Sequence, residues 1–239
     1  MSDLLNVIHE DADLLIANKP AGLVCHPTKD GEYSSLIGRL RLYLGPQGPV
    51  HLINRLDRET SGVTVAAKSA SAAGQLGKIW QSRTVRKEYL AIVHGVVQHD
   101  TGRIDLSLGK DETSAVAIKD CVRSDAAAAT TEFFVERRFQ RDGRHFTLLR
   151  LFPQTGRKHQ IRIHLAAMGH SIVGDKLYGP DENLYLAFVR GQLNDADRQR
   201  LILPHHALHC RAICFPWRGE DMVFQAPPES AFARFYEAY

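Results

Sequence analysis

Short apolar runs and alternating segments occur along most of the chain, and they are typical of β-strands. The segments that predict strands are residues 13–18, 62–68, 89–97, 102–108, 131–139, 146–152, 207–215 and 222–225. Between the fifth and sixth of these lies Arg141-Asp142-Gly143, a turn sequence that indicates a hairpin. The pattern therefore predicts a protein rich in strands, with at least one hairpin.

Other segments repeat their apolar residues at helical spacing. They predict helices at residues 35–44, 71–81 and 158–168, a helical tail at 230–239, and a local helical excursion within 180–204. Gly45 and Gly169 follow two of these helices and are typical stop signals. Residues 46–49 predict a turn, and residues 126–129 a surface connection. Helices and strands do not alternate regularly, so the fold class is α+β with a mainly antiparallel sheet.

The length of 239 residues and the hydrophobic content of 44% suit one large domain or two closely fused halves. Four scattered cysteines indicate reduced thiols rather than a disulfide framework. The first residues lack the pattern of a signal peptide, and no apolar run approaches the roughly 20 residues that span a bilayer. We therefore expect a soluble, cytoplasmic protein.

The segment from Asn54 to Gly62 is the strongest candidate for a catalytic site. Its carboxylate, Asp57, stands between Arg55 and Arg58. Nearby cations favour the ionised form of a carboxylate, and covalent or general-base chemistry requires that form. The alternative is an exposed loop with an ordinary ion pair, and this segment alone does not decide between the two.

A basic stretch extends from residue 137 to residue 164. It holds eight arginines and lysines against one acid, although the net charge of the chain is only +3. Such a stretch either neutralises phosphates of a nucleic acid or forms a solvated strand pair and helix.

Within this stretch, Arg157 and Lys158 stand where a turn leads into the helix predicted for 158–168, which is a favourable anion site. Arg162 lies next to the apolar stripe of that helix. It either turns its head toward a buried carboxylate or covers the core with its stem while the head stays in water. The glycines between residues 169 and 179 indicate tight turns, and Tyr89 by residue type is a core aromatic of a strand.

Several site types find little support. No glycine-rich phosphate loop is present, so no nucleotide cofactor is expected. The histidines and cysteines of residues 205–214 fit no standard zinc spacing and lie in a predicted strand, so we expect no metal. Ser61 lacks the GxSxG context of a hydrolase nucleophile.

Three segments in order resemble blocks of the RluA family of RNA pseudouridine synthases. They are residues 55–62 (RLDRETSG), 87–95 (KEYLAIVHG) and 155–165 (TGRKHQIRIHL) running into 169–175. Residues 18–27 and a late Gln225-Ala226-Pro227 extend the resemblance over nearly the whole chain. Three blocks in register are highly specific.

The resemblance implies a pseudouridine synthase fold with two fused halves and a central catalytic cleft. It implies that Asp57 is the essential catalytic carboxylate, that Tyr89 packs on the target base, and that Arg162 pairs with the carboxylate. Arg55 would reach into the RNA during base flipping. The family usually has histidine where this chain has Asn54, which puts RNA contacts at that position in doubt.

The resemblance also implies a uridine isomerase that needs no cofactor and acts on structured RNA, either tRNA or rRNA. Arg157, Lys158 and His159, with the arginines of the 137–150 hairpin, would contact the RNA. Residues 1–239 would form one catalytic domain without a separate N-terminal RNA-binding domain, and we expect a monomer. The alternatives are an RNA-binding protein without catalysis and a glycosidase, which needs a second paired carboxylate.

Overall fold

The computed structural model describes residues 5–27, 31–45 and 48–237. The chain divides into two compact units. The first unit contains Met1–Glu88 and His209–Glu229, and the second contains Tyr89–Leu208 and Ser230–Tyr239. The single catalytic domain and its central cleft stay predictions. No helix within the described ranges is both long and apolar enough to cross a membrane.

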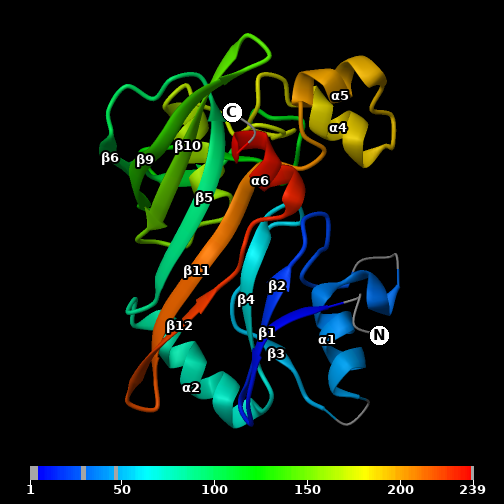
Figure 1. The fold of residues 1–239 in the computed structure, drawn as a ribbon, viewed down its shortest axis with the longest axis vertical. Coiled ribbons are helices and arrows are strands. Elements are labelled where there is room, and N and C mark those ends of the chain that lie inside the picture. The colour runs from blue at the N-terminus through cyan, green and yellow to red at the C-terminus, as the bar shows by residue number, and fades with distance from the viewer. Residues whose placement is uncertain (1–4, 28–30, 46–47, 238–239) are drawn as a thin grey trace. The chain divides into compact units, whose positions relative to one another are not determined.

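The first unit is built on a sheet whose strand order is β1-β2-β4-β11 (Figure 1). β2 pairs antiparallel with β1 and β4, whereas β11 runs parallel to β4 and antiparallel to β12. The bounds are β1 (Asn6–Glu10), β2 (Leu14–Lys19), β3 (His51–Leu52), β4 (Ser61–Ala67), β11 (Leu208–Trp217) and β12 (Glu220–Gln225). Two α-helices, α1 (Leu36–Leu44) and α2 (Ala70–Gln81), and a 3-10 turn at Glu32–Ser34 complete the unit.

Every residue of β4 is buried, the polar Ser61 and Thr64 included, which agrees with its small and mainly apolar side chains. On one side of the sheet, Leu36 and Leu40 of α1 join a core cluster with Leu15 of β2 and Ala66 of β4. The side chain of Ser35 caps α1, and Gly45 ends it with a positive φ of 83°. In the first unit, α1 thus covers one side of β4.

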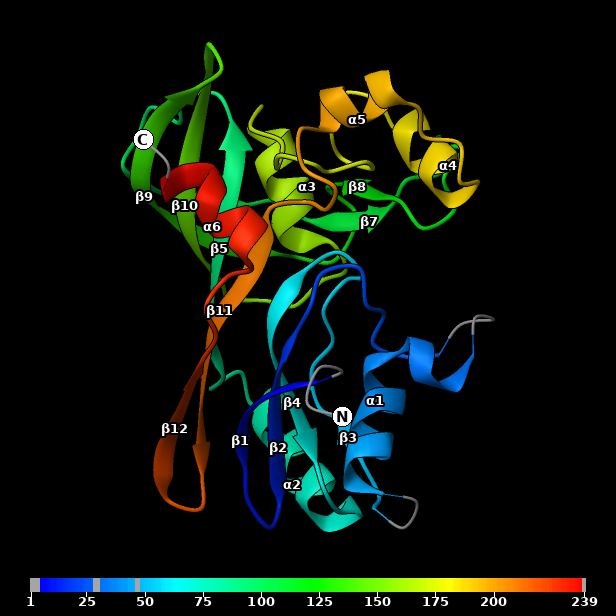
Figure 2. The ribbon, with the colours of Figure 1, turned by 45° about the vertical axis from the view of Figure 1, so that its right-hand side comes forward.

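The second unit has the antiparallel strand order β5-β10-β9-β6 and a separate β7-β8 ribbon. The strand bounds are β5 (Arg86–His94), β6 (Thr101–Asp105), β7 (Leu108–Lys110), β8 (Asp120–Val122), β9 (Thr130–Arg141) and β10 (Arg144–Pro153). The helix bounds are α3 (Gln160–Ala167), α4 (Asn183–Val189), α5 (Asp195–Leu201) and α6 (Ser230–Glu237). Figure 2 shows α3 close to the β7-β8 ribbon, with α4 and α5 following one another in the chain.

The core of the second unit lies on the sheet under two helices. Ile161 and Leu165 of α3, with Phe232 and Phe235 of α6, share one cluster with the buried residues of β5 and β10. The predicted hairpin is confirmed, because Asp142 and Gly143 both adopt positive φ, 49° and 71°, between β9 and β10. The α+β class with a mainly antiparallel sheet is confirmed as well.

Several predicted boundaries were wrong, three of them at positions with a clear local cause or a different strand partner. The strand predicted at 102–108 ends at Asp105, and Leu108 belongs instead to the β7-β8 ribbon. The strand predicted at 89–97 ends at His94, because Gly95 turns the chain with a φ of 83°. The helix predicted from residue 158 begins at Gln160, since His159 takes a left-handed conformation with φ of 55°. The turn predicted at 46–49 lies partly outside the described residues.

Candidate active site

Asp57 lies in the loop between β3 and β4 of the first unit, where its side chain is partly exposed. A turn follows it at once, because the Thr60 N–H donates to the Asp57 carbonyl at 3.2 Å. Arg55 beside it is exposed. Arg58 donates from Nε to the Gly22 carbonyl at 3.3 Å, so this guanidinium ties the loop to the turn after β2.

Lys19 supports this loop from the interior. Its side chain is fully buried, and its ammonium donates to the carbonyls of Pro20, Leu23 and Arg58 at 2.9, 2.7 and 3.1 Å. Burial lowers the pKa of Lys19 to about 8, while the nearby Cys25, Asp57 and Glu229 act in the opposite direction. The ammonium therefore fixes the backbone beside Asp57 and adds a positive charge near its carboxylate.

Asn54 has a structural role that the sequence did not reveal. Its Nδ2 donates to the Val63 carbonyl at 3.3 Å, and its Oδ1 accepts from the Val65 N–H at 2.7 Å. These two hydrogen bonds attach the start of the loop to β4 within the first unit. Further along the loop, the Leu56 N–H donates to Sγ of Cys25, with 3.4 Å between nitrogen and sulfur. The loop is consequently held at several points around Asp57.

Ser61 and His209 form a buried pair that joins β4 to β11. The Ser61 hydroxyl lies 2.9 Å from Nδ1 of His209, and Nε2 of His209 lies 2.9 Å from the Ala226 carbonyl. Since that carbonyl only accepts, Nε2 carries the proton, and Nδ1 accepts from the hydroxyl. Burial lowers the pKa of His209, which favours this neutral form. No spacing in the sequence links a histidine to Ser61. The two residues meet because β4 and β11 pair at His209 and Ser61, and both side chains are buried there.

Gly62 completes the motif for a steric reason. It has a φ of +116°, and a Cβ on it would lie 2.2 Å from the carbonyl oxygen of Cys210. Only glycine allows this close approach of β4 to β11.

In the second unit, Tyr89 begins the part of β5 that pairs with β10, opposite Leu151. Its side chain is partly buried and packs against the core cluster of this unit. Tyr89 is therefore not fully enclosed, and its role on the target base stays a prediction.

Arg162 turns its head inward, which is the first of the two orientations considered for it. Its Nε and Nη2 donate to the two carboxylate oxygens of Asp175 at 2.7 and 2.9 Å. Burial alone would raise the pKa of Asp175, but the Arg162 guanidinium holds that pKa well below its usual range. Sequence reasoning had assigned Asp175 only to a tight turn and missed this partnership.

Three of the residues predicted to bind RNA precede α3, and each of the three contacts the protein. Arg157 donates from Nε to the Ala128 carbonyl at 3.2 Å, and Lys158 forms an ion pair with Asp120 at 2.8 Å. His159 contacts the hydroxyl of Tyr178 through Nδ1 at 2.8 Å. Arg157 and Lys158 are exposed. Their RNA contacts stay a prediction.

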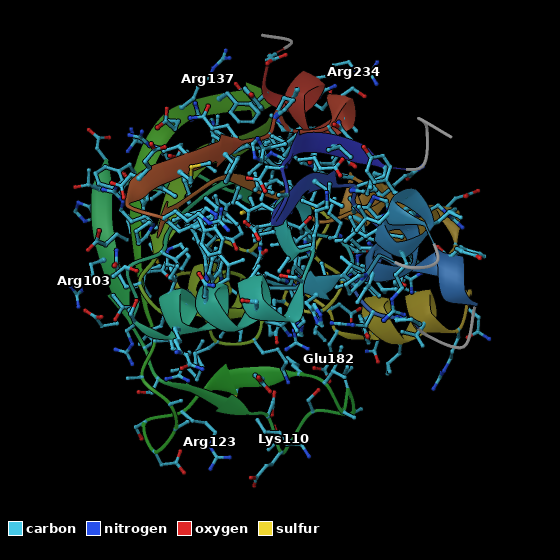
Figure 3. All side chains as sticks on the ribbon, turned by 90° about the horizontal axis from the view of Figure 1, so that it is seen from below. Arg103, Lys110, Arg123, Arg137, Glu182 and Arg234 are labelled. Carbon is cyan, nitrogen blue, oxygen red and sulfur yellow. The ribbon has the colours of Figure 1, made fainter. Side chains whose placement is uncertain are left out.

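Two arginines of the β9-β10 hairpin hold the C-terminal helix α6. Arg137 donates to the Tyr236 carbonyl at 2.8 Å, and Arg141 donates to the carbonyls of Arg234 and Phe235 at 3.0 Å each. These cations thus satisfy carbonyls at the end of α6. Figure 3 labels Arg137 and Arg234. Holding the fold is a direct role for these residues, whereas their expected phosphate contacts stay a prediction.

Among the described residues, no group of three or more histidine, cysteine, aspartate or glutamate side chains is arranged to hold a metal ion. None of the four cysteines, which all lie within the described ranges, forms a disulfide. His209, which belongs to the segment considered for zinc, instead contacts the Ser61 hydroxyl and the Ala226 carbonyl through its two ring nitrogens.

Comparison with known proteins defines the class. The profile of the RNA pseudouridylate synthase family matches residues 13–167, which include Asp57, Tyr89 and Arg162. The chain belongs to this family, as its resemblance to the RluA synthases predicted. Membership makes the protein an isomerase of uridine in RNA.

Relatives and solved structures agree with this assignment. The chain is 37% identical over 92% of its length to the dual-specificity RNA pseudouridine synthase RluA of Vibrio parahaemolyticus, covering 87% of that protein. It is 34% identical over 98% of its length to the ribosomal large subunit pseudouridine synthase D of Haemophilus ducreyi, covering 70% of it. The structure of human RNA pseudouridylate synthase domain containing 1 matches with a TM-score of 0.75 and 25% identity, covering 95% of this chain and 86% of that one.

Proposed function

We propose that Asp57 is the essential carboxylate with which this enzyme converts uridine to pseudouridine. The observation that carries the proposal is the support of its loop. Lys19, Asn54 and Cys25 hold the backbone on both sides of Asp57, while its side chain remains accessible. A catalytic group needs this combination of a fixed position and access to substrate.

The reaction requires one bond to break and another to form. The C1′–N1 bond is cleaved, the detached uracil turns, and C5 bonds to C1′. C5 then loses its proton, and N1 ends with one, so the product is an isomer of the substrate. Asp57 acts either as a nucleophile at the sugar or as a base at C2′ that gives a glycal intermediate. An ionised carboxylate serves both routes.

Arg162 and Tyr89 have complementary proposed roles. Arg162 pairs with Asp57 and keeps the carboxylate ionised in a site that excludes water. Tyr89 packs on the target base near its C5. The carboxylate would thus have a charge partner, and the base a stacking partner.

The proposed substrate is a structured tRNA or rRNA. The uridine must leave its stack, which costs a few kcal/mol and less in a loop than in a duplex. Arg55, Arg157, Lys158 and His159 would contact the RNA and offset that cost. A monomer in the cytoplasm is the proposed working form. The relative from Haemophilus ducreyi is named for the large ribosomal subunit, which supports rRNA as one substrate class.

The activity and its substrate class are tested together by mapping. Purified protein is incubated with unmodified transcripts of tRNA and rRNA, and pseudouridines are located by carbodiimide modification and primer extension. New stops at defined uridines are expected. The same mapping in cells that lack the gene identifies the natural positions. Binding without any new stop would instead favour an RNA-binding protein without catalysis.

A further inference from the structure

The segment between Gly174 and Gly179 is more than a pair of tight turns. The Asp175 side chain is fully buried, and its Oδ1 accepts from the backbone N–H groups of Leu177 and Tyr178 at 2.9 Å each. Both glycines are sterically required, because a Cβ on Gly174 would lie 2.5 Å from the His205 carbonyl oxygen and one on Gly179 would lie 2.4 Å from that of Asp175. The turn therefore holds the carboxylate of Asp175 in one place.

This carboxylate fixes one edge of Arg162. The two parallel hydrogen bonds from Nε and Nη2 define the plane of the guanidinium as well as its position. The Arg162 side chain is only 8% exposed, so water does not compete effectively for these bonds. A single bond to a flexible partner would not define the plane.

The ring of Tyr178 supports the same guanidinium. The centroid of its ring lies 4.9 Å from Cζ of Arg162. The hydroxyl of Tyr178 accepts from the Asp120 N–H at 3.1 Å and contacts Nδ1 of His159 at 2.8 Å, so the ring itself is held at its far end. Asp175 thus holds Arg162 by two hydrogen bonds, and the ring of Tyr178 contacts the same guanidinium.

We propose that Asp175 is a positioning residue that, together with the ring of Tyr178, holds Arg162 in the orientation required for the isomerisation. This inference rests on the proposed role of Arg162 at the catalytic carboxylate. An ordinary buried ion pair would stabilise the fold without affecting the chemical step. Bidentate geometry and ring support at the same guanidinium favour the positioning role, because stability alone does not require a defined plane.

The test compares Asp175→Asn with Thr147→Val. The asparagine keeps the shape and the bonds from the backbone N–H groups but loses the charge and one acceptor for Arg162. Thr147 is a matched control, since it is fully buried in the same unit and binds the backbone of Val97 and Gly95. Both variants are expected to lower the melting temperature, and both are assayed below their transitions.

Single-turnover rates at saturating RNA and the Kd for RNA are measured separately. A displaced guanidinium is expected to slow the chemical step of Asp175→Asn by roughly 100-fold, with the Kd for RNA unchanged. Thr147→Val is expected to keep the wild-type rate. An unchanged rate for folded Asp175→Asn would overturn the inference, as would an equal loss in Thr147→Val.

Arg162→Lys separates this inference from the function on which it rests. If Arg162→Lys is slow and Asp175→Asn has the wild-type rate, only the positioning role fails. If Arg162→Lys also keeps the wild-type rate, the proposed role of Arg162 fails as well.

Discussion

At the scale of single residues, the loop of Asp57 depends on side chains with little chemical signature in the sequence. Asp57 was recognisable because it stands between arginines in a family motif. Lys19 was not, because a lysine at the end of an apolar strand is usually expected at the surface. Asn54 was an unexplained departure from the family pattern until its two bonds to β4 were known. Asp175 was missed as the partner of Arg162, since spacing in a turn does not predict where a carboxylate points.

The lowered pKa of Lys19 predicts how the stability of the protein depends on pH. The unfolded chain holds this proton until the ordinary pKa of 10.5, whereas the folded protein releases it near pH 8. Between these values the unfolded state binds more protons, so the contribution of Lys19 to the free energy of unfolding rises with pH. The rise is on the order of 3 kcal/mol across the window.

Urea unfolding of the wild type and Lys19→Met between pH 7 and pH 10.5 measures this contribution. The free energy of unfolding of the wild type is expected to rise relative to that of the variant above pH 8. A difference between the two proteins that stays constant with pH would contradict the prediction.

At the scale of elements, the segments with strong hydrophobic periodicity were predicted correctly. The β9-β10 hairpin, α1, α2 and the buried strand β4 all occur near their predicted positions. β1 was missed because its sequence, NVIHE, has few apolar residues and none of them is fully buried. β8 was missed because it has three residues and depends on pairing with β7. Short edge strands are defined by their partners more than by their own sequence.

The close approach of Cys210 to Gly62 predicts that a side chain at position 62 lowers the free energy of unfolding. Gly62→Ala is expected to lower the free energy of unfolding by more than about 3 kcal/mol, because the methyl group would overlap the backbone of Cys210. Gly77→Ala in α2 is the control, since a Cβ there meets nothing within 4 Å. It is expected to stabilise by about 0.5–1 kcal/mol. Denaturant titration of both variants measures these values, and equal effects would contradict the steric argument.

At the scale of the whole molecule, part of the positive charge of the basic stretch also holds the fold together. The basic stretch of residues 137–164 was open to two interpretations, phosphate binding or a solvated surface. The structure adds a third use, because Arg137 and Arg141 bind carbonyls at the end of α6. Such long-range contacts join segments about 95 residues apart and have no local sequence signal.

Salt dependence distinguishes cations that bind phosphate from those that hold the fold. Lys158→Ala is expected to reduce the magnitude of the slope of log K against log salt by about 1, as for loss of one phosphate contact. Arg137→Ala is expected to lower the melting temperature, because it removes a bond to α6, and a slope reduced by about 1 would show that Arg137 contacts phosphate as well. Filter binding of a transcript at several salt concentrations measures both slopes. An unchanged slope for Lys158→Ala would remove this residue from the RNA interface.

The central claim is that Asp57 performs the chemistry, and release of tritium from RNA labelled at uridine C5 tests it most directly. Asp142→Asn is the matched control, because Asp142 lies in a hairpin turn with φ of 49° that asparagine tolerates. The account predicts release by the wild type and by Asp142→Asn, and none above background by folded Asp57→Asn. Release by Asp57→Asn at the wild-type rate would contradict it.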